Sequence, residues 1–155
     1  MSFVFFTDRD LGKRFPQILV SAGLKVERHD DIFPPTCTDE EWLEYVGQKG
    51  RIAVTHNSRI RYMPNELAAV ERHKVALLVI VGKAPLPTLA KNFVNTMPRI
   101  SAFLSAHETP FIAKIYRPSP SKVDDGANAQ GSVFLWHSGQ KRTSRSSSGR
   151  PPRRN

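Results

Sequence analysis

The fold of this chain is decided by residues 2–14, SFVFFTDRDLGKR, in which an apolar run at residues 3–6 ends abruptly in polar residues. Phe and Val favour strands, and a short continuous apolar run is typical of a strand buried on both faces of a sheet. Residues 11–22 then have the apolar spacing of a helix. Asp8 is therefore expected at the carboxyl end of a central parallel strand, where open α/β sheets bind ligands. There its carboxylate can hold a hard cation or cap the next helix, and this stretch alone favours neither role.

The alternation of strand and helix continues along the chain. Apolar runs predict five strands, at residues 3–6, 24–27, 51–55, 75–81 and 111–116. Helical spacing predicts helices between them, at residues 11–22, 39–48, 64–73 and 86–106. This order predicts a single α/β domain with a mainly parallel five-stranded sheet flanked by helices, joined by right-handed crossovers and closed by an edge strand.

Positive charge is concentrated towards the carboxyl terminus. Residues 1–117, the predicted domain, contain 16 Lys and Arg and 12 Asp and Glu, a net charge of +4. Residues 118–155 contain 7 Lys and Arg and 2 Asp and Glu, a net charge of +5, which is over half of the total of +9. The second region is rich in Pro, Ser and Gly, so it is expected to be a disordered, flexible basic tail, with residues 133–136 as an apolar island of unassigned packing. The charge favours a nucleic acid partner, with a merely soluble basic protein as the alternative.

Cysteine content and hydropathy lead us to expect a cytoplasmic protein without a membrane partner. Cys37 is the single cysteine, so the chain forms no internal disulfide and has no Cys/His zinc spacing, which suits a reducing compartment. The first residues lack the charge and apolar core of a signal peptide. No apolar run approaches the ~18 residues that a membrane span needs.

Polar clusters follow three of the predicted strands. They are Asp8 and Asp10 after the first strand, His29, Asp30 and Asp31 after the second, and His56 and Asn57 after the third. The next helix begins with Asp39, Glu40 and Glu41, with Thr38 and Glu41 at the spacing of a capping box. Carboxylates that converge on one edge of a sheet repel one another unless a cation such as Mg²⁺ or Mn²⁺ joins them. Helix capping and solvated loop positions are the alternative roles for these residues.

Four segments carry a resemblance to a known family. They are FFTDRDLGKRF (5–15), HDDIFPPTCTDEEWL (29–43), RIAVTHNSRIRYMPNEL (51–67) and PFIAKIYRP (110–118). In this order, over roughly residues 3–117, the chain resembles the PIN-like domain family, in the branch of VapC-like toxins related to the Mut7-C type. The resemblance implies a small α/β nuclease fold, metal-dependent cleavage of RNA as an endoribonuclease, and the toxin role in a toxin–antitoxin pair.

The resemblance also implies roles for individual residues. Asp8 and Asp39 would hold a Mg²⁺ or Mn²⁺ ion, Asn57 would occupy the third ligand position, and Glu40 would assist catalysis. The family has an acidic residue at the third position, whereas the amide oxygen of Asn57 can ligate but brings no negative charge. Metal affinity is therefore expected to be weakened, whether this Asn is natural or engineered.

RNA and a cognate antitoxin protein are the expected partners, and a homodimer is compatible with the sequence. Arg9, Arg59 and Arg61 are the expected contacts to RNA phosphates, with solvated surface arginines as the alternative.

Two other functions remain open at this point. The first is a catalytically inactive PIN-like domain that binds RNA or a partner protein, which the uncharged Asn57 favours. The second is a receiver-like signalling domain, in which an aspartate of the acidic cluster accepts a phosphoryl group. The chain has no Gly-rich phosphate loop, which disfavours a nucleotide-binding domain of the flavodoxin type.

Overall fold

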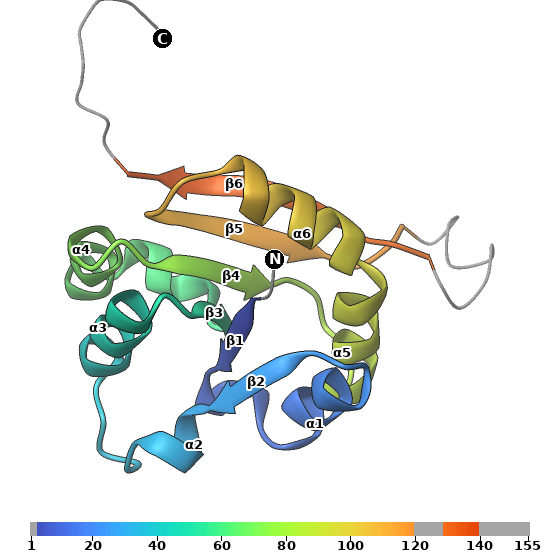
Figure 1. Ribbon diagram of the computed structural model, residues 1–155, viewed down its shortest axis with the longest axis horizontal. Coiled ribbons are helices and arrows are strands. Elements are labelled where there is room, and N and C mark those ends of the chain that lie inside the picture. Colours follow the sequence, from blue (N-terminus) through green and yellow to red (C-terminus); the bar gives the residue numbers. More distant parts are fainter. Residues whose placement is uncertain (1–2, 120–128, 140–155) are drawn as a thin grey trace, which may run out of the picture.

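The computed structural model describes residues 3–119 and 129–139, which form one α/β sandwich around a central sheet (Figure 1). The strands lie in the order β2-β1-β3-β4-β5-β6, with β1 to β5 parallel and β6 antiparallel to β5. Their bounds are β1 Val4–Thr7, β2 Lys25–Arg28, β3 Ile52–Thr55, β4 Ala76–Ile80, β5 Phe111–Tyr116 and β6 Ser132–Ser138.

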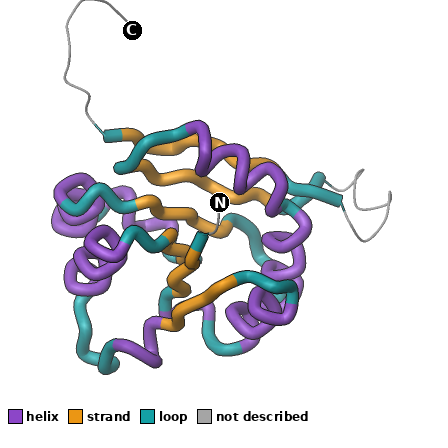
Figure 2. The backbone as a smooth tube through the Cα atoms, viewed as in Figure 1, coloured by secondary structure: helices purple, strands orange, loops and turns teal. Residues whose placement is uncertain are grey.

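Helices cover both faces of this sheet, as the purple and orange segments of Figure 2 show. Their bounds are α1 Arg14–Ser21, α2 His29–Ile32, α3 Asp39–Lys49, α4 Pro64–Arg72, α5 Leu86–Asn95 and α6 Met97–Ala106, with the short 3₁₀ helices η1 Arg9–Leu11 and η2 Ser58–Tyr62. Helices α1, α5 and α6 contribute to one apolar core, and α3 and α4 contribute to the other.

Neighbouring residues of β1 supply opposite cores, because side chains alternate across a strand. The ring of Phe5 packs edge-on against Phe93 of α5 at 5.5 Å between centroids. The ring of Phe6 stacks on Trp42 of α3, also at 5.5 Å. Both phenylalanines are buried, which confirms the prediction of a strand that is covered on both faces.

The α/β class and the mainly parallel sheet are confirmed, and several element bounds differ from the prediction. Helix α1 begins at Arg14 instead of residue 11, because Gly12 takes a positive φ of 65° and ends η1. The helix predicted at residues 86–106 is two helices, α5 and α6, which meet at Thr96. The short helix α2 holds His29, Asp30 and Asp31, which follow the second strand and for which no helix was predicted.

The prediction of five strands is wrong by one, because β6 pairs along β5 and makes β5 an interior strand. Val133 of β6 packs against the core beneath α6, and Trp136 packs against the core beneath α4. Thr96 and Arg99 anchor the start of the strand through hydrogen bonds to the amide and carbonyl of Gly131 (2.9 and 2.7 Å). The sheet thus extends past residue 117, where the sequence placed the end of the domain, while residues 120–128 and 140–155 of the predicted tail lie outside the described residues.

No helix in residues 3–119 or 129–139 is long and apolar enough to cross a membrane.

Candidate active site

Asp8 lies at the carboxyl end of β1 and is hydrogen-bonded to the end of β3. The backbone amide of Asp8 donates to the carbonyl of Val54 (2.9 Å), which fixes Asp8 beside the neighbouring strand. The hydroxyl of Thr55, the last residue of β3, donates to Asp8 Oδ2 at 2.8 Å. Asp8 Oδ1 accepts from the amide of Arg9 (2.7 Å), so Asp8 also caps η1. Of the two roles considered for Asp8, helix capping is present in the structure, and binding of a cation stays a prediction.

Asp10 brings a second carboxylate to the same hydroxyl. Its Oδ2 lies 3.2 Å from Thr55 Oγ1, and it accepts from the backbone amide of His56 at 3.1 Å. The Thr55 hydroxyl already accepts from the amide of Asn57 at 3.1 Å, and it has one proton to donate. It can therefore donate to Asp8 or to Asp10 at any moment, but not to both, so the two carboxylates compete for this one proton.

The environment disfavours negative charge on this pair. The pKa of Asp8 is raised to about 7, first because the carboxyl is buried and next because the charge of Asp10 lies beside it. The pKa of Asp10 is also raised, mainly by desolvation of its carboxyl at the cluster, although the residue as a whole is exposed to solvent. Asp39 adds to both shifts through its charge. The three aspartates therefore form one electrostatically coupled cluster at the carboxyl edge of the sheet.

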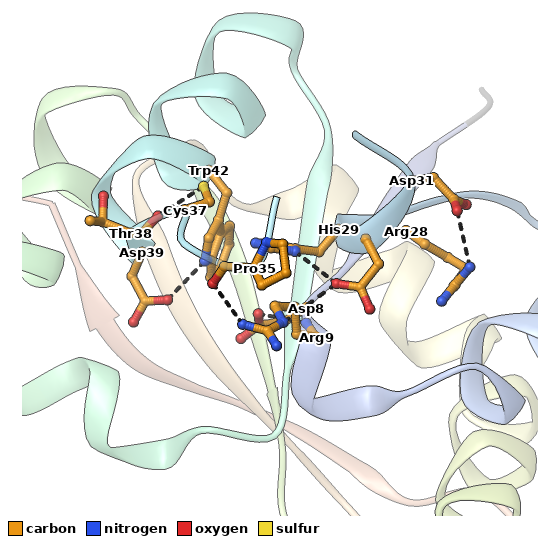
Figure 3. Close-up of polar contacts among 11 residues, drawn as sticks. Asp8, Arg9, Arg28, His29, Asp31, Pro35, Cys37, Thr38, Asp39 and Trp42 are labelled. Atoms are coloured by element: carbon orange, nitrogen blue, oxygen red, sulfur yellow. Dashed lines mark hydrogen bonds and ion pairs between the residues drawn. The ribbon is translucent and has the colours of Figure 1, made fainter. Parts of the chain in front are cut away.

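Asp39 enters this cluster from the first turn of α3. Thr38 caps the helix, and Thr38 and Glu41 form the predicted capping box, with their amide-to-side-chain hydrogen bonds at 2.8 and 3.2 Å. Asp39 Oδ1 accepts a hydrogen bond from the indole Nε1 of Trp42 at 2.8 Å (Figure 3). This bond occupies one carboxylate oxygen and holds the Asp39 side chain on the solvent side of the buried indole.

Asn57 joins the cluster through its backbone. Its amide donates to Thr55 Oγ1, as described, whereas its side-chain oxygen accepts from the amide of Arg59 at 3.1 Å and caps η2. The side-chain oxygen that was expected to ligate a metal is therefore engaged in capping. Glu40 is exposed on the first turn of α3, and its assisting role stays a prediction.

The amino-terminal half of the chain matches a family model described as a PIN-like domain, over residues 3–82. The chain belongs to the PIN-like domain family. The matched region runs from β1 to the turn after β4 and contains the whole aspartate cluster. Proteins of this family are generally nucleases, commonly bind nucleic acid and are typically dependent on divalent metal ions. No curated protein and no solved structure matches the chain.

Membership of the PIN-like family bears on the alternatives that the sequence left open. It supports a nuclease-type domain over the receiver-like signalling domain, since the match spans all three polar strand ends. It leaves the VapC-like and Mut7-C-related branch as a prediction, together with the choice between an active and an inactive member.

A hard divalent ion fits part of this PIN-like site. Among the described residues, no group of three or more His, Cys, Asp or Glu side chains is arranged to hold a metal. Asp8 and Asp10 nevertheless supply two adjacent carboxylates whose charged forms are disfavoured, which is the situation that a cation relieves. Mg²⁺ usually binds through one or two carboxylates together with waters and substrate phosphates, so this pair is the part of the shell that the chain would supply.

Asp10 and Thr55 are the members of the site that sequence reasoning left unassigned. Asp10 stood in the polar cluster after β1, and its spacing of two residues from Asp8 was the available signal. Thr55 reads in the sequence as an ordinary strand residue, and its hydroxyl gains a role only because β1 and β3 are neighbours.

The arginines expected to contact RNA have three different surroundings. Arg9 is held by the protein, because its Nε lies 3.4 Å from Asp30 and its Nη1 donates to the carbonyl of Pro35 at 3.0 Å (Figure 3). Arg59 is exposed on η2. The guanidinium of Arg61 lies over aromatic rings. Contact of these residues with RNA stays a prediction.

Proposed function

We propose that this PIN-like protein is a Mg²⁺- or Mn²⁺-dependent endoribonuclease whose catalytic centre is the aspartate cluster after β1. The observation that carries the proposal is the pairing of Asp8 and Asp10 on one Thr55 hydroxyl, with the pKa of Asp8 raised to about 7. A carboxyl whose pKa is raised by burial and by a neighbouring charge, and which lies at the ligand-binding edge of an α/β sheet, is a candidate for a functional site.

In this proposal each residue of the cluster has a distinct part. Asp8 and Asp10 hold the ion, and the Thr55 hydroxyl and the His56 amide orient their carboxylates. Asp39 adds negative charge from α3, and Asn57 fixes the end of β3 through its amide. The ion, when bound, polarises the scissile phosphate and lowers the pKa of attacking water. Glu40 and the amide oxygen of Asn57 are the remaining candidates for contact with the ion or its waters.

Because Asn57 is uncharged, the site attracts the cation less strongly than it would with an aspartate at this position. We therefore expect weak metal binding and slow cleavage, with Mn²⁺ or high Mg²⁺ needed for activity. The biological role that follows from the VapC-like resemblance is that of a cytoplasmic toxin neutralised by a partner antitoxin. A small open reading frame adjoining the gene for this chain, whose product binds the chain and blocks cleavage, is the expected finding.

The test of the nuclease proposal is cleavage of a labelled single-stranded RNA with Mn²⁺ and with EDTA. The parent protein should cleave with Mn²⁺ alone, and Asp8→Asn should not cleave. Asp31→Asn is the matched control, because Asp31 is an exposed carboxylate that pairs with Arg28 outside the cluster. Cleavage that survives Asp8→Asn, or that EDTA does not stop, would overturn the proposal.

A second candidate function is favoured by the capping role of the Asn57 side chain. A PIN-like domain in which the side chain at the third ligand position caps a helix can bind RNA or a partner protein without cleaving RNA. This candidate predicts that RNA binds equally well with Mn²⁺ and with EDTA, and that no product forms in either case.

A further inference from the structure

Two pairs of aromatic rings lie on β5, β6 and η2, outside the aspartate cluster. Tyr62 meets Trp136 edge-on, with centroids 5.7 Å apart and ring planes at 80°. Tyr116 meets Phe134 in the same way, at 5.4 Å and 85°. Lys114 connects the two pairs, because it is paired with Phe134 in the β5–β6 ladder and its Nζ lies 3.9 Å from the Trp136 ring centroid. We call these five residues the aromatic platform.

The platform lies on the side of the sheet that α4 covers. Alternation along β5 sends Ala113 and Ile115 into the core beneath α6, and sends Ile112 into the core beneath α4. Lys114 and Tyr116 have the same parity as Ile112, so they stand on the α4 side of the sheet. His137 of β6 reaches Glu71 of α4 at 2.8 Å, which marks where α4 meets this surface.

Two rings of the platform are open to solvent. Tyr62 is 69% exposed and Phe134 is 58% exposed, which is unusual for large aromatic side chains. Trp136 and Tyr116 are partly buried beneath them. Each pair therefore has an inner ring that is anchored in the protein and an outer ring that offers its surface to a ligand.

Two cations, Arg61 and Lys114, lie against the rings of Tyr62 and Trp136. The guanidinium of Arg61 lies 5.6 Å from the Tyr62 centroid and 5.7 Å from the Trp136 centroid, within the range of cation–π attraction. The nearby carboxylate of Glu71 is engaged by His137. Exposed aromatic rings set among cations are the arrangement by which proteins bind single-stranded nucleic acids, since bases stack on the rings and phosphates meet the cations.

The 3₁₀ helix η2 connects this surface to the aspartate cluster. It begins after Asn57, whose amide contacts the Thr55 hydroxyl, and it ends at Tyr62. Five residues at a rise of ~2.0 Å each make it about 10 Å long. A single-stranded RNA that runs from the aspartate cluster along η2 would reach Tyr62 within about three nucleotides, if its bases are stacked at a spacing of ~3.4 Å.

We propose that the aromatic platform binds single-stranded RNA next to the cleavage position, with bases stacked on Tyr62 and Phe134 and phosphates held by Arg61 and Lys114. The inference rests on the proposed function in taking RNA as the substrate. It assigns the β6 strand, which lies outside the region matched by the family model, to substrate recognition.

The test is binding of a fluorescently labelled single-stranded RNA to the full chain in EDTA, where cleavage does not interfere. Tyr62→Ala and Phe134→Ala should each raise the Kd by about tenfold, the effect expected for loss of one stacked base. Tyr62→Phe should bind like the parent, because the ring is kept. Val20→Ala is the matched control, since Val20 is 55% exposed on α1, away from the platform. Melting temperatures of all variants should stay close to that of the parent.

The outcomes separate this inference from the nuclease proposal. Loss of binding in both alanine variants supports the platform even if the parent shows no Mn²⁺-dependent cleavage, in which case the nuclease proposal alone fails. If the parent does cleave, the alanine variants should raise KM with little change in kcat. Kd values within twofold of the parent in both variants, or no RNA binding by the parent, would overturn the platform, whatever the cleavage assay shows.

Discussion

The hydroxyl of Thr55 donates a hydrogen bond to Asp8 at 2.8 Å, which joins the ends of β1 and β3 at the centre of the candidate active site. Thr55 is fully buried, and its oxygen also lies 3.2 Å from Asp10. One buried hydroxyl thus organises two acids, Asp8 at the N-cap of η1 and Asp10 within it. A cation bound by both acids would release the hydroxyl from this competition.

Thr55→Val tests whether this hydroxyl positions the aspartates. In the parent, the hydrogen bond from the Thr55 hydroxyl lowers the pKa of Asp8 and of Asp10. The substitution keeps the shape of the side chain and removes this hydroxyl. Mn²⁺ affinity measured by calorimetry should fall roughly tenfold, as for other residues that orient metal ligands. Thr55→Ser retains the hydroxyl and should bind Mn²⁺ like the parent. Equal Mn²⁺ affinities in the Val and Ser variants would contradict a positioning role.

The raised pKa of Asp8 predicts that the metal-free protein loses stability as pH rises. Between the unfolded value of 3.8 and the folded value of about 7, the folded state keeps a proton that the unfolded state has released. The penalty is absent at low pH and fully present above pH 7. Asp8→Asn removes it, so this variant should gain stability relative to the parent by about 2 kcal/mol more at pH 8 than at pH 5.

Urea denaturation in EDTA at both pH values measures this difference. Comparison of the parent and the variant at the same pH cancels the titration of groups outside the cluster, whereas the coupling of Asp8 to Asp10 and Asp39 is part of the measured effect. Asp31→Asn, which removes an exposed carboxylate, should show no such pH-dependent gain. An equal effect of Asp8→Asn at pH 5 and pH 8 would show that Asp8 is not perturbed.

Asn57→Asp tests the effect of the missing charge. Asp is also a good N-cap, so the hydrogen bond to the Arg59 amide and the start of η2 should be preserved. Without metal, the added charge should repel Asp8 and Asp10 and lower the melting temperature slightly. With Mn²⁺, the melting temperature should rise more than in the parent, and RNA cleavage should increase. Asp8→Asn in the same background should abolish both gains, and their persistence would separate Asn57 from the cluster.

Truncations distinguish β6 from the rest of the region that was predicted to be a tail. Deletion of residues 118–155 should lower the melting temperature, because it removes a strand paired to β5 and the Trp136 side chain that packs on the α4 core. Deletion of residues 140–155 should leave the melting temperature unchanged. It should also flatten the salt dependence of RNA binding, by ~0.7 in slope for each RNA phosphate that the shortened chain no longer neutralises. Equal melting temperatures in the two truncated proteins would contradict the role of β6.

Much of the fold could be predicted from the sequence, because burial on both sides leaves a direct signature in β1. Phe5 and Phe6 are both apolar since each faces its own core. The strand β6 also contains an apolar run, at residues 133–136, but this run did not indicate where the segment packs, because β6 lies at the edge of the sheet and Phe134 and Leu135 remain exposed. Its place in the sheet depends on backbone pairing with β5 and on anchoring by Thr96, and neither is visible in local composition.

The sequence could predict which residues of the candidate site lie at strand ends and helix starts. It could not predict the contacts that form between neighbouring strands. Asp8 and Asp39 follow from the order of elements, since parallel strand ends and helix starts meet at one edge. The sharing of Thr55 between Asp8 and Asp10 follows from the packing of β1 beside β3. The capping use of the Asn57 side chain depends on the turn into η2, which the sequence did not reveal.

The central claim, that Asp8 and Asp10 hold a divalent ion, is tested most directly by Mn²⁺ binding at pH 8, measured by calorimetry on the parent and on the double variant Asp8→Asn, Asp10→Asn. The account predicts one Mn²⁺ bound by each parent chain and none by the double variant. Binding should weaken at pH 6, because Asp8, with a pKa of about 7, is then largely protonated. No Mn²⁺ bound by the parent, or equal binding by the double variant, would contradict the account.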